Sequence, residues 1–240
     1  MRKGDARRSE LLATAERLFY TKGYEKTSVQ DILTEMNFSK GGFYHHFDSK
    51  LSVLEAICEL RAQEGCEQAK QAVANCEGSA VDKLNAVFGA SQILTSGQQS
   101  FVALLIQVAY RDDGALMREK MKRSQFESLQ PVFEEILEQG AAQQEFMVTD
   151  VRFSAQMLLR MNLMFTDDIA FLLAKEESEE RLLDAAVRKL NVYRTSIERM
   201  LIAPFGSIVL LEAKDLQMLV QSVLRDRIRR RADALLGGKA

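Results

Sequence analysis

Apolar side chains recur with a helical period along almost the whole chain. Between Leu11 and Phe19 they return at intervals of one and three residues, which predicts a first helix over residues 6–22 that ends at Gly23. No segment alternates apolar and polar residues as a half-buried strand would, so the pattern predicts an all-α fold of about ten helices. Beyond residue 50, helices are expected over residues 50–75, 80–94, 98–110, 114–139, 151–174, 179–201 and 207–236.

Residues 27–50 predict two short helices joined by a tight turn. Thr27 is expected to cap the first helix, with Gln30 reaching back to complete a capping box. Asn37 tolerates the left-handed backbone that often ends a helix, and Phe38 is expected to lie beneath the turn. The apolar face of this first short helix is formed by Val29, Ile32, Leu33 and Met36.

The second short helix, from about Lys40 to Phe47, has the chemistry that a DNA groove requires. Ser39 is expected to cap it, and no acidic residue occurs in it before Asp48, so it can approach a polyanion. Phe43 and Phe47 lie four residues apart and are predicted to anchor the helix in the core.

Residues spread over the first 55 positions carry a family resemblance. They are Phe19, Gly23, Tyr24, Thr27, Ser28, Val29, Ile32, Ser39, Lys40, Gly41, Tyr44, His45, Phe47, Ser49, Lys50 and Leu54. Together they resemble the signature of the TetR family of bacterial transcriptional regulators. Three positions differ from the usual family pattern: Asn37 stands where glycine is common, Gly42 where Thr, Ser or Ala often occurs, and His46 where an aromatic residue is usual.

The resemblance implies a division of the chain and a function. It implies a three-helix helix-turn-helix DNA-binding head over residues 1–50 and a helical ligand-binding and dimerisation body over residues 51–203. Residues 204–240 form a C-terminal helical extension, because Pro204 and Gly206 interrupt the pattern. The implied function is that of a sequence-specific transcriptional regulator, a repressor that a small-molecule effector releases from its operator, with no cofactor.

The predicted partner is a double-stranded, near-palindromic operator bound by a homodimer, with half-sites about 34 Å apart. Lys40, Tyr44 and Lys50 are expected to touch phosphates, while His45 and the glycine pair lie closest to the base edges. The full set of expected DNA contacts is Arg7, Thr27, Ser28, Lys40, Gly41, Gly42, Tyr44, His45 and Lys50.

Two further sites are expected in the body. Residues 101–110 are apolar on all sides, which is typical of a helix in the middle of a bundle, and such a helix can line a cavity. The expected pocket residues are Phe101, Gln107, Tyr110, Arg111, Met161, Asn162, Phe165 and Asp168. By the resemblance, the dimer interface uses the two apolar-faced helices near the end of the body, through Phe153, Met157, Met164, Leu190, Tyr193 and Ile197.

Composition and charge agree with a globular regulator. Of the 240 residues, 47% are apolar and 28% charged, and the net charge is −2. Residues 1–50 carry nine Lys and Arg against seven Asp and Glu, so the mild positive excess lies in the predicted head. No early apolar run resembles a signal peptide and no apolar stretch approaches the ~20 residues that span a bilayer, so a cytoplasmic protein without a membrane partner is expected.

A redox-responsive regulator is one alternative. Cys58 and Cys76 lie eighteen residues apart, on the same face of one helix, but a rise of ~27 Å separates them. A disulfide between them within a straight helix is therefore excluded, and buried thiols are the preferred interpretation.

Three more alternatives remain open. An enzyme is disfavoured because the two histidines, His45 and His46, are adjacent and lack a metal-ligand or triad partner, although a carboxylate site around Asp167 and Asp168 is conceivable. A helical interaction protein that no longer binds DNA is another alternative. Finally, the basic run between Arg225 and Arg231 is either a solvated helix end or a second nucleic-acid contact.

Overall fold

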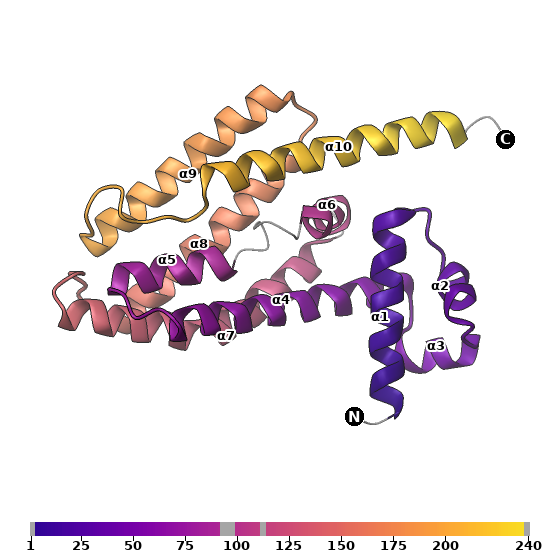
Figure 1. The fold of residues 1–240 in the computed structure, drawn as a ribbon, viewed down its shortest axis with the longest axis horizontal. Coiled ribbons are helices and arrows are strands. Elements are labelled where there is room, and N and C mark those ends of the chain that lie inside the picture. Colours follow the sequence, from indigo (N-terminus) through magenta and orange to yellow (C-terminus); the bar gives the residue numbers. More distant parts are fainter. Residues whose placement is uncertain (1–2, 92–98, 111–113, 238–240) are drawn as a thin grey trace. The chain divides into compact units, whose positions relative to one another are not determined.

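The computed structural model describes residues 3–91, 99–110 and 114–237, and within these ranges the chain is all-helical with ten α-helices. This confirms the predicted fold class. The helices are α1 (Lys3–Thr21), α2 (Val29–Met36), α3 (Lys40–His46), α4 (Lys50–Ala74), α5 (Ala80–Ser91), α6 (Gln99–Val108), α7 (Ala115–Ala142), α8 (Val151–Ala174), α9 (Glu179–Leu201) and α10 (Ala213–Gly237) (Figure 1).

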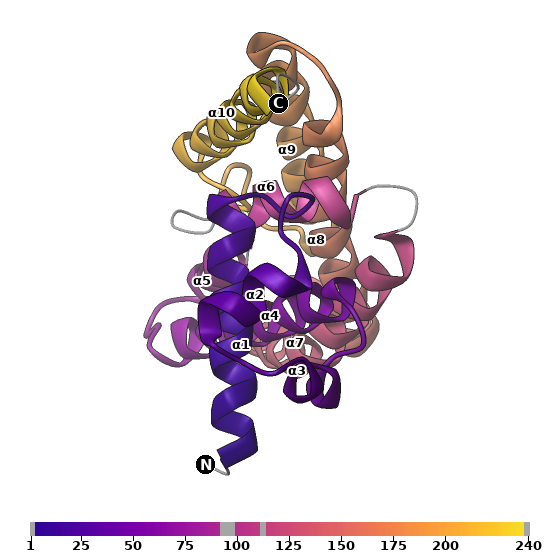
Figure 2. The same ribbon diagram turned by 90° about the vertical axis from the view of Figure 1, so that its right-hand side faces the viewer.

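The chain forms two compact units, residues 1–62 and 63–240, which are called the head and the body below. In the head, α2 and α3 lie on one side of α1 (Figures 1 and 2). The core between these helices is formed by fully buried apolar side chains, and it includes the predicted anchors of α1 and α3. These side chains are Leu11, Leu12, Ala15, Phe19, Ile32, Leu33, Phe43, Phe47, Val53, Leu54 and Ile57.

In the body, α8 packs against both α7 and α9, and α10 packs against α6 and α9. The helix α6 contacts α8 as well as α10, so it is enclosed from two directions. Its residues Phe101–Ile106 are all buried, which explains why this segment is apolar on every side.

The segment before α10 departs from the predicted helix over residues 207–236. The side chain of Asn85 brackets this segment: its Nδ2 donates to the carbonyl oxygen of Ser207 and its Oδ1 accepts from the N–H of Val209, both at 2.8 Å. The buried carboxylate of Glu198 accepts from the N–H of Gly206 at 2.8 Å. Because side chains satisfy these backbone groups, the segment stays non-helical until Ala213 while Ile208 is buried.

We expect Asn85→Ala to lower the free energy of unfolding by about 1–2 kcal/mol, since one part-buried and one exposed hydrogen bond are lost, each contributing up to about 1 kcal/mol. Urea denaturation followed by circular dichroism measures this change. The matched control is Asn191→Ala, at an exposed position of α9, which should change stability by less than about 0.5 kcal/mol. Equal stability of the two variants would contradict the bracketing role of Asn85.

Candidate nucleic-acid interface

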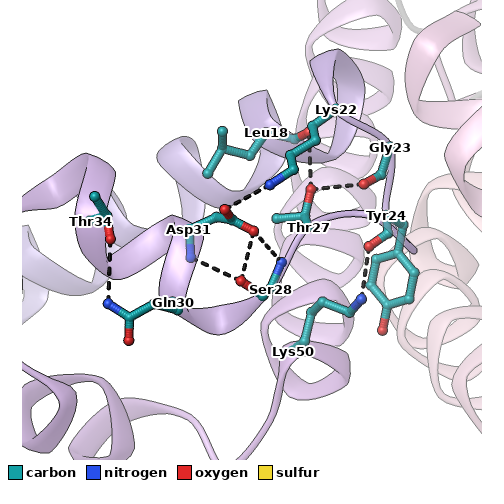
Figure 3. Close-up of polar contacts among 10 residues, drawn as sticks. All are labelled: Leu18, Lys22, Gly23, Tyr24, Thr27, Ser28, Gln30, Asp31, Thr34 and Lys50. Carbon is teal, nitrogen blue, oxygen red and sulfur yellow. Dashed lines mark hydrogen bonds and ion pairs between the residues drawn. The ribbon is translucent and has the colours of Figure 1, made fainter. Parts of the chain in front are cut away.

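The start of α2 is fixed by a capping box between Ser28 and Asp31 (Figure 3). The N–H of Asp31 donates to Oγ of Ser28 at 3.1 Å, and the N–H of Ser28 donates to Oδ2 of Asp31 at 2.7 Å. The predicted box between Thr27 and Gln30 is therefore wrong by one residue. The amide of Gln30 instead donates to the hydroxyl of Thr34 along the outside of the helix.

Asp31 also forms an ion pair with Lys22, whose Nζ lies 2.7 Å from Oδ1 (Figure 3). Hydrogen bonds from Lys22 and then from Ser28 hold the pKa of this carboxyl well below its usual range. Since the pKa is depressed in the folded state, its contribution to stability is present at neutral pH and is lost as the pH falls through the acid range.

Thr27 lies inside the head. Only 1% of its surface is exposed, and its hydroxyl donates to the carbonyl oxygen of Gly23 at 2.8 Å (Figure 3). This burial argues against the expected DNA contact by Thr27, because the side chain already holds the loop between α1 and α2. Ser28 is exposed next to it.

The turn between α2 and α3 has the predicted geometry. Asn37 has a φ of 49°, in the left-handed region, and the N–H of Phe38 donates to the carbonyl oxygen of Leu33 at 2.9 Å. Ser39 caps α3 by accepting the N–H of Gly42 on its hydroxyl at 3.1 Å. Asn37 therefore does here what glycine commonly does in the family.

The two glycines of α3 have different surroundings. A Cβ atom added at Gly42 would lie 2.7 Å from Cζ of the Phe38 ring, whereas one added at Gly41 would meet nothing within 4 Å. Gly42 thus packs its backbone on Phe38, and the expectation that it faces the base edges needs revision. Gly41 remains on the exposed side of the helix.

The exposed face of α3 contains most of the groups predicted to meet DNA. Lys40, Gly41, Tyr44 and His45 are all exposed, and half of the Tyr44 surface is accessible. The helix carries no acidic residue. The structure brings these groups together on one surface that is suited to phosphates and base edges.

Lys50 is engaged within the head. Its Nζ donates to the carbonyl oxygen of Tyr24 at 2.8 Å and lies 4.2 Å from the centre of the Tyr24 ring (Figure 3). Partial burial lowers the pKa of Lys50. Lys50 therefore joins the start of α4 to the loop after α1, and any phosphate contact would use its remaining donors.

The two arginines near the start of α1 are also placed by contacts. Arg7 forms an exposed ion pair with Glu10, with 2.7 Å between Nη1 and Oε2. The guanidinium carbon of Arg8 lies 5.2 Å from the centre of the Phe47 ring, just after α3. Arg8 is thus closer to α3 than the sequence alone indicated.

Sequence reasoning missed a polar network between α1 and α4. Arg61 donates from Nε and Nη2 to the carboxylate of Glu16 at 2.9 and 2.8 Å, and the hydroxyl of Tyr20 donates to the same carboxylate at 2.6 Å. Burial and the contact with Glu16 raise the pKa of Tyr20. No local spacing indicates this contact, because Glu16 and Arg61 lie 45 residues apart.

In the body, a small cavity of about 40 Å³ lies between α6, α7 and α8. Tyr110 is the one predicted pocket residue that lines it; Phe101, Asn162 and Phe165 are buried elsewhere in the core, and Met161 is half-buried away from the cavity. The side chains of Gln107 and Arg111 lie outside the described residues. The lining residues are Val102, Leu105, Ile106, Ala109, Tyr110, Arg118, Met121, Lys122, Gln125, Leu163, Thr166, Asp167 and Ala170.

Asp168, expected in the pocket, instead joins α8 to α9. It accepts from Lys189 at 2.9 Å and from the hydroxyl of Tyr193 at 3.1 Å. Burial, followed by this hydrogen bond, raises the pKa of Tyr193 to about 12. Tyr193 was predicted at the dimer interface and Asp168 in the ligand pocket. The two residues instead bind each other within one monomer.

The predicted dimer residues fall into two groups. Phe153, Met157 and Met164 on α8 are exposed, with accessible fractions of 65, 54 and 58%. Leu190 is partly buried, and Ile197 is fully buried within the monomer, so it cannot belong to an exposed interface in this conformation.

The alternatives based on other chemistry find little support in the described part of the chain. Burial raises the pKa of the Cys58 thiol to about 12, as predicted for an unreactive thiol, and Cys66 is buried as well. Cys76 is only partly buried and lies beyond the end of α4, so the prediction of two buried thiols on one helix is wrong for Cys76. The described residues contain no group of His, Cys, Asp and Glu side chains able to hold a metal ion. Among the helices that the structure describes, none is both long and apolar enough to cross a bilayer.

Two arginines of the C-terminal basic run make contacts inside the body. Arg227 donates to the carbonyl oxygen of Leu173 at 2.8 Å, and Arg231 pairs with Glu176 at 2.7 Å. Both partners lie at the end of α8 or just after it. The Arg227 contact is partly buried, whereas Arg231 and Glu176 form an exposed ion pair, as expected of a solvated helix end.

Known proteins resemble the chain in sequence and fold. Residues 11–57 match the profile of bacterial regulatory proteins of the tetR family. The chain is 28% identical over 168 residues to the uncharacterized HTH-type transcriptional regulator YfiR of Bacillus subtilis, covering 66% of this chain and 77% of YfiR. It is 45% identical over 51 residues to the HTH-type transcriptional repressor KstR2 of Rhodococcus jostii, covering 21% of this chain and 25% of that protein.

Among solved structures, a TetR-family transcriptional regulator from Pectobacterium atrosepticum matches 84% of this chain and 97% of its own, with a TM-score of 0.56 and 19% identity. At this identity the match shows a shared fold. Several curated relatives, KstR2 among them, are matched over about a quarter of their length or less.

The capped α2–α3 pair and the helical body define a helix-turn-helix protein with a separate all-α unit. Residues 11–57 thus carry the N-terminal segment of bacterial regulatory proteins of the tetR family, and about two thirds of the chain is similar to an HTH-type transcriptional regulator.

We expect Gly42→Ala to weaken DNA binding and to lower stability, because the added methyl group displaces the Phe38 ring and with it the turn that orients α3. Gly41→Ala is the matched control: it adds the same group in open space and should stabilise the helix by up to about 1 kcal/mol. Thermal unfolding and fluorescence anisotropy with duplex DNA measure both effects. Because Gly41 lies on the predicted DNA-contacting face, it serves as the control for stability alone. A Gly42→Ala variant as stable as Gly41→Ala and binding DNA as tightly as the wild type would disprove the packing role.

Proposed function

We propose that the protein is a transcriptional repressor that binds a near-palindromic operator as a homodimer and leaves it when a small-molecule effector binds the body. The observation that carries the DNA-binding part is the exposed, acid-free face of α3, with Lys40, Tyr44 and His45 on a capped and well-packed helix pair. Lys40 is placed to meet a phosphate and His45 a base edge.

Repression is supported by the names of two relatives. KstR2 of Rhodococcus jostii is a transcriptional repressor, and IcaR of Staphylococcus aureus is a negative regulator of a biofilm operon that is 40% identical over 48 residues. These matches cover about a quarter of each relative, so they bear on the DNA-binding segment alone.

Dimerisation is supported by the exposed apolar face of α8. Phe153, Met157 and Met164 are separated by four and seven residues, which places them on one side of the helix. A row of large exposed apolar side chains on a helix is typical of a surface that a partner covers. A second copy of this chain fits because a two-fold interface uses the same face twice.

Effector control is supported by the cavity in the body. Its volume of about 40 Å³ holds only a few water molecules, whereas small-molecule sites are typically ~300–1,000 Å³. An effector must therefore widen the cavity, and a ligand that binds the widened body better than the closed one shifts the population between the two states. The helix α4 contains residues of both units, so it provides a covalent route from body to head.

Selection of bound fragments from a genomic DNA library, followed by a reporter assay on the selected promoters, tests this function. A repressor lowers expression from a promoter that carries the selected site. Absence of any enriched sequence, or higher expression on binding, would exclude the proposal.

With a selected operator in hand, we expect Lys40→Ala to weaken binding to all DNA sequences to a similar extent and to reduce the slope of log affinity against log salt by about 1. We expect His45→Ala also to relax sequence preference, with a loss of roughly 1 kcal/mol for the preferred operator. Anisotropy titrations at several salt concentrations measure both. Arg188→Ala, at an exposed body position, is the control and should bind as the wild type does.

For the dimer, we expect Met157→Glu to convert the protein to monomers and to weaken operator binding, since a charge is buried against its symmetry mate. Met218→Glu, on α10, is the matched control and should leave the assembly unchanged. Sedimentation velocity decides between them. A Met157→Glu variant that sediments as the wild-type dimer would exclude this face as the interface.

A further inference from the structure

A surface groove of about 600 Å³ runs between the N-terminal half of α7 and the middle of α8. Its floor is apolar, and Leu116 in it is more than half exposed, while Met164 lies at the edge that the groove shares with the proposed dimer face of α8. The described residues that line it are Leu116, Glu119, Lys120, Lys122, Arg123, Phe126, Arg160, Leu163 and Met164.

The groove carries an excess of positive charge. Its described lining contains the cations Lys120, Lys122, Arg123 and Arg160, against the single carboxylate of Glu119. Arg160 lies with its guanidinium carbon 4.6 Å from the centre of the Phe126 ring, so its charge is held over the apolar floor. Arg123 forms a long, exposed ion pair with Glu127, with 3.6 Å between Nε and Oε1.

The groove and the small cavity share a wall. Lys122 and Leu163 line both of them, so these two side chains separate the groove from the cavity between α6, α7 and α8. Lys122 binds in both directions: its Nζ lies 3.0 Å from Asp167 on the cavity side and 2.5 Å from Glu119 on the groove side.

The cavity behind this wall is mainly apolar, with Val102, Leu105 and Ile106 contributed by α6. At its polar end, the hydroxyl of Tyr110 donates to Asp167 at 2.7 Å. If Lys122 turns away from Asp167, this carboxylate still keeps a hydrogen bond. The wall can therefore open without leaving a buried charge that has no partner.

We propose that the groove and the cavity form one binding site for an amphipathic anion, a molecule with an unbranched apolar tail and a carboxylate or phosphate head. The tail passes Leu163 into the cavity, and the head pairs with Lys122 and the groove cations. The role of this site in regulation rests on the proposed function, because the amphipathic anion would be the effector that releases the operator.

The positive charge of the groove favours an amphipathic anion over a cationic or a neutral ligand. A cation with an apolar tail would be repelled by the four positive side chains of the groove. A neutral alcohol would form no ion pair with these side chains. An anionic head does repel Glu119, but that side chain is 70% exposed and can turn to solvent. An acidic peptide would fit the groove but not the narrow cavity behind it.

The test uses isothermal titration calorimetry of the full-length protein without DNA. The probes are decanoate, decyl phosphate and decyltrimethylammonium. We expect both anions to bind at one site per chain at least about tenfold more tightly than the cation. Comparison of decanoate with octanoate reports burial of the tail, which strengthens binding by up to about fourfold per methylene group.

Variants locate the site. The double variant Lys120→Gln/Arg160→Gln should weaken decanoate binding by about tenfold, from two ion pairs of ordinary strength. Arg152→Gln is the matched control, because Arg152 is an exposed arginine of α8 outside the groove, and it should bind as the wild type does. Equal affinity for the anions and the cation, or an unchanged affinity in the double variant, would overturn the proposal.

Operator binding is then measured separately in the presence of decanoate. If decanoate binds as expected but the operator complex persists, the proposed binding site is supported, and the proposal that its ligand releases the operator is contradicted. If the operator is released by a compound whose affinity is the same in the wild type and the double variant, effector release stands and the groove is not its site.

Discussion

The contact between the Phe38 ring and the backbone of Gly42 determines how the head presents α3. An aromatic ring lies under the first turn of the helix, so close that a Cβ atom at position 42 would require the ring to move. This close approach fixes α3 against the turn, while Asn37 in the left-handed region and the Ser39 cap fix the turn itself. Because these contacts orient α3, Lys40, Tyr44 and His45 are held on one exposed face rather than spread around a mobile helix.

Much of the fold can be predicted from the sequence, because apolar residues recur with the helical period along each long amphipathic helix. The bounds of α8 and α9 agree with the prediction at both ends, and the predicted roles of Asn37, Ser39, Phe43 and Phe47 are confirmed. The capping box was predicted one residue too early because Thr27 and Ser28 can both cap a helix. Only the tertiary structure shows that the Thr27 hydroxyl donates to the carbonyl oxygen of Gly23 instead.

The sites in the body were harder to predict for a physical reason. The helix α8 is apolar on its exposed face as well as on its buried face, so no polar face indicates its rotation, and the sequence alone does not show which of Asp167 and Asp168 faces the cavity. In the structure Asp167 lines the cavity while Asp168 binds Lys189 on α9. The non-helical segment before α10 was missed because its apolar side chains also fit a helix, and the bracket from Asn85 comes from more than a hundred residues away.

The enclosure of α6 has a consequence for how the body is made. Residues Phe101–Ile106 of this helix are all buried, and α10, the last helix in the chain, is among the helices that contact it. During synthesis α6 leaves the ribosome long before α10 exists to cover it. The nascent body therefore spends that interval with an uncovered apolar helix, and exposed apolar surface of this kind favours aggregation until α10 has emerged.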